Sequence, residues 1–286
     1  MTSTKSLEPA LYVVATPLGN LGDLSPRARE VLAGADVVLA EDTRRTGTLF
    51  KRLGIASHGF TSFHEHNEDG RQEQVLAHLE EGRCVALVSD AGTPLLSDPG
   101  FTLVRACRQR GFAVVPVPGP SAPLAALMAC GLPPQPFTFL GFMPRKDGER
   151  RRLLERHAPT GATLIFFERK NRVMDSLQAA FEVLGPREVC VARELTKIHE
   201  DFIVGRLDAL DALEIPLLGE FTVVVGPPAA GDVAVDEQAL RDILRAERAA
   251  GGKPREIARR AAARAEGWST GAAYELLRTL DSHLDD

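Results

Sequence analysis

A polar loop at residues 90–100 follows directly on a short apolar run and leads into an amphipathic segment at 99–110. A strand, a tight loop and a helix in that order make one unit of an α/β fold. We expect Asp98 to cap this helix and Pro99 to take its first position. Gly92 leaves room for a ligand to approach the backbone. The loop has neither a P-loop pattern nor a Gly-x-Gly-x-x-Gly turn, so we do not expect a simple NAD or ATP site.

Two further loops repeat this arrangement. An apolar run at 13–16 leads into residues 17–23, and another at 114–117 leads into residues 118–122. In an open parallel sheet, the loops at the carboxyl ends of the strands line one ligand crevice. We therefore predict that all three loops converge on a single site.

The spacing of apolar residues predicts two α/β regions. The first half alternates strand-like and helical segments, which is typical of a parallel sheet covered by helices. Its expected strands lie at 11–16, 35–41, 84–89 and 113–118, and its expected helices at 25–34, 43–54, 70–81 and 99–110. The second half has fewer helices per strand, which favours a mixed sheet, with strands at 137–142, 163–168, 188–194, 202–206 and 221–226 and helices at 121–130, 147–157 and 171–184.

Proline and glycine mark the boundaries between these regions. A stiff turn at 131–136 is the best candidate hinge, and residues 227–232 have the composition of a linker. The segment beyond resembles a helical bundle with a helix-turn-helix capped by Ser269, with helices expected at 236–250, 254–266 and 269–281. We expect an N-terminal α/β domain at 1–120, a second α/β domain at 121–228 and a C-terminal helical domain at 229–286.

Composition restricts the class of protein. The chain of 286 residues is 44% hydrophobic and 26% charged, which is ordinary for a soluble globular protein larger than one typical domain. We find no apolar stretch of about 18 residues and no apolar signal core at the N-terminus, so we expect a cytoplasmic protein without a membrane partner. A net charge of −5 argues against general coating of nucleic acid, so any such binding must be local. The cysteines are widely spaced, which favours buried free thiols over a metal site or disulfides, at Cys84, Cys107, Cys130 and Cys190.

Several motifs together resemble one family, the ribosomal RNA small-subunit methyltransferase I group of the tetrapyrrole-methylase-like, S-adenosylmethionine-dependent enzymes. The resemblance spans about residues 11–226, and its motifs lie at 15–23, 41–44, 63–68, 90–100, 141–146 and 193–197. It implies two α/β domains with the cofactor cleft between them. It also implies a homodimer that methylates the 2′-hydroxyl of a cytidine in 16S rRNA, at the decoding centre of the assembled small ribosomal subunit. Residues implied to bind S-adenosylmethionine are Pro17, Asp90, Gly92, Thr93, Ser121, Ala122, Phe167 and Leu195.

A general base is expected beside the cofactor, because a ribose hydroxyl is a poor nucleophile until it loses its proton. Asp42 is the leading candidate, since it ends an apolar run at the same sheet edge as Asp90. The alternative is that Asp42 caps the helix starting near Thr43. If Asp42 is the base, Asp42→Asn abolishes methyl transfer and leaves cofactor affinity near that of the wild type. Further catalytic candidates are Glu65, His64, Glu168 and Lys197.

The run at 63–68 places His64 and His66 on one face of an extended segment. That spacing suits a metal, but His78 is too distant in sequence to be an evident third ligand, so no metal is expected. By resemblance, this loop faces the RNA.

Basic residues gather at two strand ends. The usual explanation of such a run is a solvated helix face, but two clusters beside one cleft favour contact with RNA phosphates. The first cluster contains Arg145, Lys146, Arg150, Arg151, Arg152 and Arg156, and the second contains Arg169, Lys170 and Arg172. The expected RNA-binding residues are Arg44, His64, His66, Arg145, Lys146, Arg151, Arg152, Arg169, Lys170 and Arg172.

The chain departs from its family after the Phe-Phe-Glu strand, where the family usually has a small residue, Pro, His and Arg. Here residues 169–172 are Arg-Lys-Asn-Arg, so only the last position matches and no family role carries over to Asn171. Two alternatives stay open: a tetrapyrrole carbon methylase and a non-catalytic, ribosome-associated RNA-binding protein. The 63–68 motif, the cluster starting at Arg145 and the C-terminal helices argue against the first, and the intact cofactor loops argue against the second.

Overall fold

The computed structural model describes residues 7–229, 237–265 and 268–282. Its first domain is a five-stranded parallel sheet in the order β3-β2-β4-β1-β5. The strands are β1 (Leu11–Val14), β2 (Val37–Ala40), β3 (Phe60–Ser62), β4 (Val85–Val88) and β5 (Val114–Val117). The helices are α1 (Pro26–Gly34), α2 (Thr43–Leu53), α3 (Glu68–Glu80) and α4 (Phe101–Gln109).

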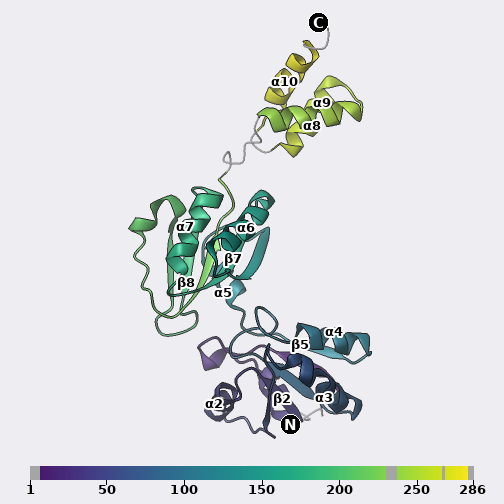
Figure 1. Ribbon diagram of the computed structural model, residues 1–286, viewed down its shortest axis with the longest axis vertical. Helices are drawn as coiled ribbons and strands as arrows, with labels where there is room; N and C mark the ends of the chain where they lie inside the picture. The colour runs from purple at the N-terminus through teal and green to yellow at the C-terminus, as the bar shows by residue number, and fades with distance from the viewer. Residues whose placement is uncertain (1–6, 230–236, 266–267, 283–286) are drawn as a thin grey trace.

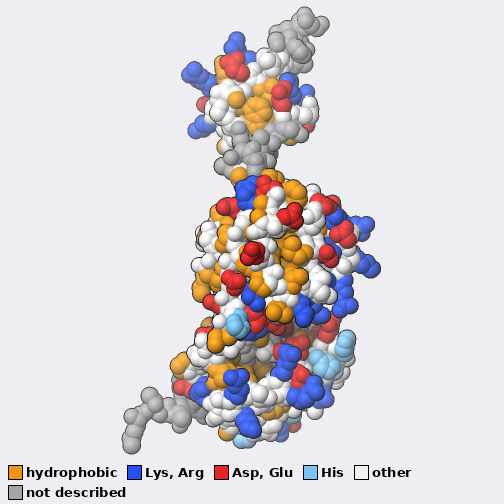
Figure 2. Space-filling model, turned by 90° about the vertical axis from the view of Figure 1, so that its left-hand side faces the viewer, with side chains coloured by type: hydrophobic (Ala, Val, Ile, Leu, Met, Phe, Trp, Pro, Cys, Tyr) orange, Lys and Arg blue, Asp and Glu red, His pale blue; other side chains and the backbone are white. Residues whose placement is uncertain are grey.

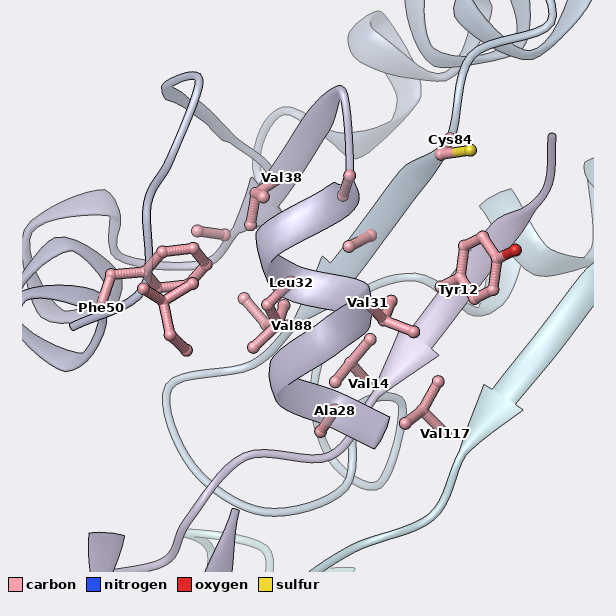
Figure 3. Close-up of a cluster of buried hydrophobic side chains, with 14 of the residues drawn as sticks. Tyr12, Val14, Ala28, Val31, Leu32, Val38, Phe50, Cys84, Val88 and Val117 are labelled. Carbon is pink, nitrogen blue, oxygen red and sulfur yellow. The ribbon is translucent and has the colours of Figure 1, made fainter. Parts of the chain in front are cut away.

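Helices cover both faces of this sheet. Tyr12 and Val14 of β1 point to a cluster beneath α1 and α2, whereas Leu11 and Val13 point to a second cluster beneath α3 and α4. This alternation follows from the two-residue period of a strand. Figure 3 shows the first cluster, in which the apolar face of α1 lies against the strands. Burial on both faces explains why the inner strands β2 and β4 are apolar throughout.

Two local expectations in this domain were wrong. The sequence did not reveal β3, a strand of only three residues that pairs with β2. The helix after the 90–100 loop begins at Phe101, not at Asp98 or Pro99. Its first turn is capped from another helix, because the Glu68 carboxylate accepts from Gly100 N at 2.9 Å and from Thr102 Oγ1 at 2.9 Å.

The second domain is the expected mixed sheet, in the order β6-β7-β10-β8-β9. Only β6 and β7 are parallel, and the other three pairs are antiparallel. The strands are β6 (Phe137–Phe142), β7 (Thr163–Arg169), β8 (Glu188–Arg193), β9 (Asp201–Arg206) and β10 (Glu220–Val225), with helices α6 (Asp147–His157) and α7 (Val173–Leu184). Short 3₁₀ turns are η1 (Leu21–Asp23), η2 (Ala158–Thr160) and η3 (Leu207–Ala212).

Helix α5 (Ala122–Ala129) connects the two sheets (Figure 1). Ala126 and Leu127 pack on the face of the second sheet formed by Ile165 and Val224. The first residues of α5 therefore hold the 118–122 loop against the second domain. The hinge at 131–136 stays a prediction.

The C-terminal segment forms three helices, as expected: α8 (Glu237–Ala249), α9 (Pro254–Arg264) and α10 (Thr270–Ser282). Leu240, Leu244, Ile257 and Leu277 belong to its buried core. Ser269 accepts a hydrogen bond from Ala272 N at 3.1 Å, as a capping residue does. The predicted linker at 227–232 lies outside the described residues from 230 onward.

The four cysteines are free and buried, as predicted. Within the described ranges, none of the helices is long and apolar enough to span a membrane.

Candidate active site

The three predicted loops meet at the carboxyl ends of β1, β4 and β5. Thr16 and Gly92 form an isolated bridge, with Thr16 N donating to Gly92 O at 2.8 Å and Gly92 N donating to Thr16 O at 3.0 Å. Thr93 Oγ1 donates to Pro120 O at 2.9 Å, which ties the second loop to the third. The convergence predicted from the sequence is thus confirmed.

A cavity of about 760 Å³ opens between these loops and the second domain. The first domain contributes Asp90, Gly92, Thr93 and other loop residues to its wall. The second domain contributes the ends of β6 and β7, the turn after β7 and the start of β10, through Phe142, Phe167, Glu168, Arg169, Lys170, Asn171, Glu220, Phe221 and Thr222. Neither domain alone forms this site.

The 90–100 loop is held in an unusual backbone conformation. Leu95 and Ser97 have φ values of 72° and 76°, a region that side chains rarely adopt. Gly92 has a φ of 78°, and a Cβ there would lie 3.0 Å from Leu18 Cδ2. Strained residues of this kind gather at ligand sites, where the surrounding structure holds them in place.

Carboxylates gather on the first-domain side of the cavity at Glu41, Glu65, Asp90 and Asp98. Burial and the nearby Glu41 carboxylate raise the pKa of Asp98 to about 6, against a hydrogen bond from Ser89 that lowers it. Burial and the charge of Asp90 likewise raise the pKa of Glu41. Arg45 also lines the first-domain side of the cavity, and its Nη1 pairs with Asp90 Oδ2 at 3.0 Å. This part of the cavity suits a cationic ligand.

The opposite wall is aromatic. The rings of Phe142 and Phe167 lie 5.3 Å apart between centroids, and those of Phe139 and Phe167 lie 4.9 Å apart. Arg169 Cζ sits 6.0 Å from the centroid of Phe142. Two rings and a guanidinium therefore border the carboxylate-lined space.

A family model, Tetrapyrrole (Corrin/Porphyrin) Methylases, matches residues 10–211. The chain belongs to this family. It is 47% identical over 96% of its length to a protein named Ribosomal RNA small subunit methyltransferase I from Mesorhizobium japonicum, covering 94% of that protein. It is 45% identical to a protein of the same name from Escherichia coli O157:H7, covering 84% of this chain and 86% of the relative.

Two solved structures share the fold. The methyltransferase CobJ aligns with a TM-score of 0.58 at 21% identity, covering 77% of this chain and 95% of that one. A diphthine synthase aligns with a TM-score of 0.60 at 14% identity, covering 76% and 89%. At these identities the likeness shows the fold alone.

Six of the eight residues expected to bind the methylase cofactor line the cavity: Asp90, Gly92, Thr93, Ser121, Ala122 and Phe167. Leu195 instead packs behind the wall, in the buried cluster that includes Ala122 and Leu18. Pro17 is also buried and does not line the cavity. Any role for these two residues is to support the wall.

Asp42 lies outside this cavity and caps α2, which is the alternative that the sequence left open. Its carboxylate accepts from Arg44 N at 2.9 Å and pairs with Arg44 Nη2 at 3.0 Å. Hydrogen bonds from the Arg44 side chain and backbone lower the pKa of Asp42 to about 2. A carboxylate with so low a pKa is a weak proton acceptor, so the structure does not favour Asp42 as the base.

The other catalytic candidates occupy different places. Glu65 is exposed and lines the cavity. Lys197 does not line it, and its Nζ pairs with Glu194 at 3.0 Å and with Glu220 at 3.2 Å. Burial lowers the pKa of Lys197, but these carboxylates outweigh burial and raise it. Lys197 therefore stays charged, which suits a link between loops better than a base.

Glu168 is buried and forms an ion pair with Arg172. The Glu168 side chain is 0% exposed and lies 2.5 Å from Arg172 Nη2. Ser176 Oγ donates to Glu168 at 2.6 Å, and Arg150 Nη1 donates to Ser176 at 2.9 Å. Both guanidinium groups thus make contacts within the second domain, and RNA binding by Arg172 stays a prediction.

The remaining predicted RNA contacts are more accessible. Arg169 and Lys170 are exposed and line the cavity. Arg145, Lys146 and Arg152 are exposed around α6, whereas Arg151 pairs with Asp147 and Glu182. His66 is exposed, and His64 is half-buried against Asn67. Across the described residues there is no cluster of three or more His, Cys, Asp or Glu that could hold a metal ion.

Sequence reasoning missed several wall residues. Asp98 carried a signal, an acid in the ligand loop, but was interpreted as a helix cap. Glu41 precedes the favoured Asp42 and was passed over, although it is the one of the pair that lines the cavity. Phe221 and Thr222 carried no signal, because only the pairing of β10 with β7 brings them to the site.

Proposed function

We propose that this protein transfers the methyl group of S-adenosylmethionine to the ribose 2′-hydroxyl of a cytidine in 16S rRNA, at the decoding centre of the small ribosomal subunit. One observation carries the proposal: a cavity between the two domains combines carboxylates, an aromatic wall and exposed cations. The relatives named for small-subunit rRNA methylation match nearly the whole chain, which supports the choice of substrate.

The cavity fits S-adenosylmethionine, which carries a sulfonium, an ammonium and an adenine. Glu41, Asp90 and Asp98 supply negative charge for the cationic groups. Ser121 Oγ is a buried polar atom without a hydrogen-bond partner, as expected where a ligand completes the site. Phe167 offers an apolar surface to an aromatic ring. The cofactor supplies an electrophilic methyl group, and the protein holds it in place.

Catalysis in this site is mainly positioning. Methyl transfer needs the hydroxyl oxygen, the methyl carbon and the sulfur nearly in line, and such alignment is worth roughly 7–11 kcal/mol. We propose Glu65, rather than Asp42, as the group that accepts the hydroxyl proton, because Glu65 lines the cavity. A positioned base contributes about 10²–10⁴-fold.

The exposed cations beside the cavity would bind RNA phosphates. Arg169 and Lys170 lie at its wall, and Arg145, Lys146 and Arg152 follow the neighbouring strand β6. Phosphate contacts fix the position of the RNA and make affinity depend on salt. RNA affinity that barely changes with salt would contradict this assignment.

We also propose a cytoplasmic homodimer. The edge strand β9 exposes Val204 at 56%, and Met128 and Ile198 are exposed at 85% and 94%. An edge strand presents unpaired backbone groups, to which a strand of a second copy can pair. Light scattering coupled to gel filtration tests the dimer, and a monomer at micromolar concentration would contradict it.

The decisive experiment maps 2′-O-methyl groups on 16S rRNA from cells with and without the gene. We expect one cytidine to lose its methyl group and to regain it when the gene is restored. An unchanged map would contradict the proposed substrate.

Isothermal titration with S-adenosylmethionine separates the alternatives. A non-catalytic RNA-binding protein gives no heat of cofactor binding. A tetrapyrrole methylase binds the cofactor but leaves the RNA map unchanged. Binding of the cofactor together with loss of one ribose methyl group supports the proposal.

A further inference from the structure

A second pocket, of about 510 Å³, lies on the outer face of α2, apart from the cavity just described. We propose that this pocket binds a backbone phosphate of the RNA strand next to the target nucleotide. The inference rests on the proposed function and names a further part of its RNA site. The pocket, called here the α2 pocket, is lined by Leu21, Asp42, Arg44, Arg45, Thr48, Leu49 and Arg52.

The α2 pocket is built from one helical face. Arg44, Thr48 and Arg52 follow one another at intervals of four residues, and residues four apart in a helix are neighbours on its surface. The eight-residue separation of Arg44 and Arg52 corresponds to about 12 Å along the helix axis. The two guanidinium groups therefore flank Thr48, whose hydroxyl donates to Arg44 O at 2.9 Å, so the arginines are the donors available to an anion.

The charge of α2 favours an anion. Its eleven residues include four cations and no carboxylate, in a chain whose net charge is −5. The capping carboxylate of Asp42 is the acid in the pocket wall, and it pairs with Arg44 at 3.0 Å. Arg52 is exposed and has no ion pair among the described residues. The pocket therefore keeps excess positive charge, and planar guanidinium groups suit phosphate oxygens.

The α2 pocket shares one wall residue with the cavity. Arg45 lines both, and its Nη1 pairs with Asp90 Oδ2 at 3.0 Å on the cavity side. Asp42 N also donates to Asp90 Oδ1 at 3.1 Å, so the start of α2 is fixed to the cavity wall. Figure 1 places α2 at the left of the first domain, and Figure 2 looks onto that side, where blue side chains dot the surface. An RNA strand leaving the cavity past Arg45 meets this pocket next.

A matched pair of variants tests the proposal. Arg52→Gln removes a pocket cation, whereas Lys51→Gln removes the same charge from the adjacent residue, which does not line the pocket. Successive residues point about 100° apart around a helix. The measurement is affinity of the full chain for transcribed 16S rRNA and for small ribosomal subunits, at several salt concentrations.

We expect Arg52→Gln to weaken RNA binding roughly ten-fold and to lower the salt slope by about one, as for loss of one phosphate contact. Lys51→Gln should weaken it less than about two-fold, and Arg52→Lys should recover part of the affinity because it keeps the charge but not the planar fork. In methylation assays the loss should appear chiefly in KM for RNA. Affinity for S-adenosylmethionine should match the wild type in both Gln variants.

Two results would overturn the proposal that the α2 pocket binds a phosphate. Equal losses in Arg52→Gln and Lys51→Gln would mean diffuse attraction by charge, and no loss in either would mean that the RNA runs elsewhere. Both results are distinct from failure of the proposed function, in which the wild-type protein itself methylates no small-subunit RNA.

Discussion

The side chain of Lys197 in the second domain passes directly over the backbone of Gly19 in the first. A Cβ on residue 19 would overlap Lys197 Cγ, which lies near the root of that side chain. Asn20 N also donates to Thr196 Oγ1 at 3.1 Å, so adjacent residues make a second contact between the same loops. The glycine is therefore required for the approach of the two domains beside the cavity.

We predict that Gly19→Ala displaces Lys197 and weakens S-adenosylmethionine binding several-fold, because the cavity wall comes from both domains. Overpacking of this kind also costs about 1–3 kcal/mol of the free energy of unfolding. Adding Lys197→Ala removes the overlap, so the double variant should bind more tightly than Gly19→Ala alone. Titration calorimetry on the wild type, Gly19→Ala, Lys197→Ala and the double variant gives the coupling energy between the two residues. Gly148→Ala is the control, since a Cβ there meets nothing within 4 Å.

We predict that Arg172→Ala destabilises the protein by about 3–5 kcal/mol, because it leaves the fully buried Glu168 carboxylate without its cation. Lys170→Ala, two residues earlier and exposed, should change the free energy of unfolding by less than about 0.5 kcal/mol. Denaturant unfolding measures both. Similar stabilities of the two variants would contradict the assignment of Arg172 to the folded core.

We predict that affinity for S-adenosylmethionine falls as the pH drops through about 6. Burial and the Glu41 carboxylate raise the pKa of Asp98 to about that value. Below that pH, Asp98 is protonated and no longer attracts the cationic cofactor. Asp98→Asn should bind more weakly at pH 7.5 and show a flatter dependence between pH 7 and 5. Calorimetric titrations across this range measure the effect. A wild-type affinity that stays constant down to pH 5 would contradict it.

The same residue gives a prediction for stability. A carboxyl group whose pKa is higher in the folded state binds more protons there than in the unfolded chain, so its contribution to stability falls as the pH rises from about 4 to 6. Asp98→Asn removes that penalty. We expect it to stabilise the protein at pH 7.5 by on the order of 1 kcal/mol, allowing for partial exposure. The gain should vanish near pH 4 in thermal unfolding.

We predict that Glu65→Gln lowers kcat by at least about 10²-fold, whereas Asp42→Asn retains most of the turnover. Asparagine caps helices as well as aspartate does, so Asp42→Asn preserves the start of α2. Single-turnover methylation of small ribosomal subunits measures both variants. Loss of activity in Asp42→Asn with normal cofactor affinity would restore Asp42 as the base.

The alternation of strands and helices, the mixed second sheet and the convergence of three loops could all be predicted from the order of residues along the chain. These follow from local periodicity and from the rule that parallel strands place their carboxyl ends at one edge. Ser25, for example, caps α1 as its sequence indicates, because it accepts from Ala28 N at 3.1 Å within the same turn.

Which charged groups are available to a ligand depends on the packing of the folded chain and could not be predicted from the sequence. Arg172 and Arg169 look alike in sequence, yet the first pairs with the buried Glu168 and the second is exposed and lines the cavity. Asp98 resembled a helix cap, but Glu68 from α3 performs that role and Asp98 joins the cavity wall. The physical reason is that burial and pairing of a charge depend on residues distant in sequence, whereas periodicity and capping are set within a few residues of the chain.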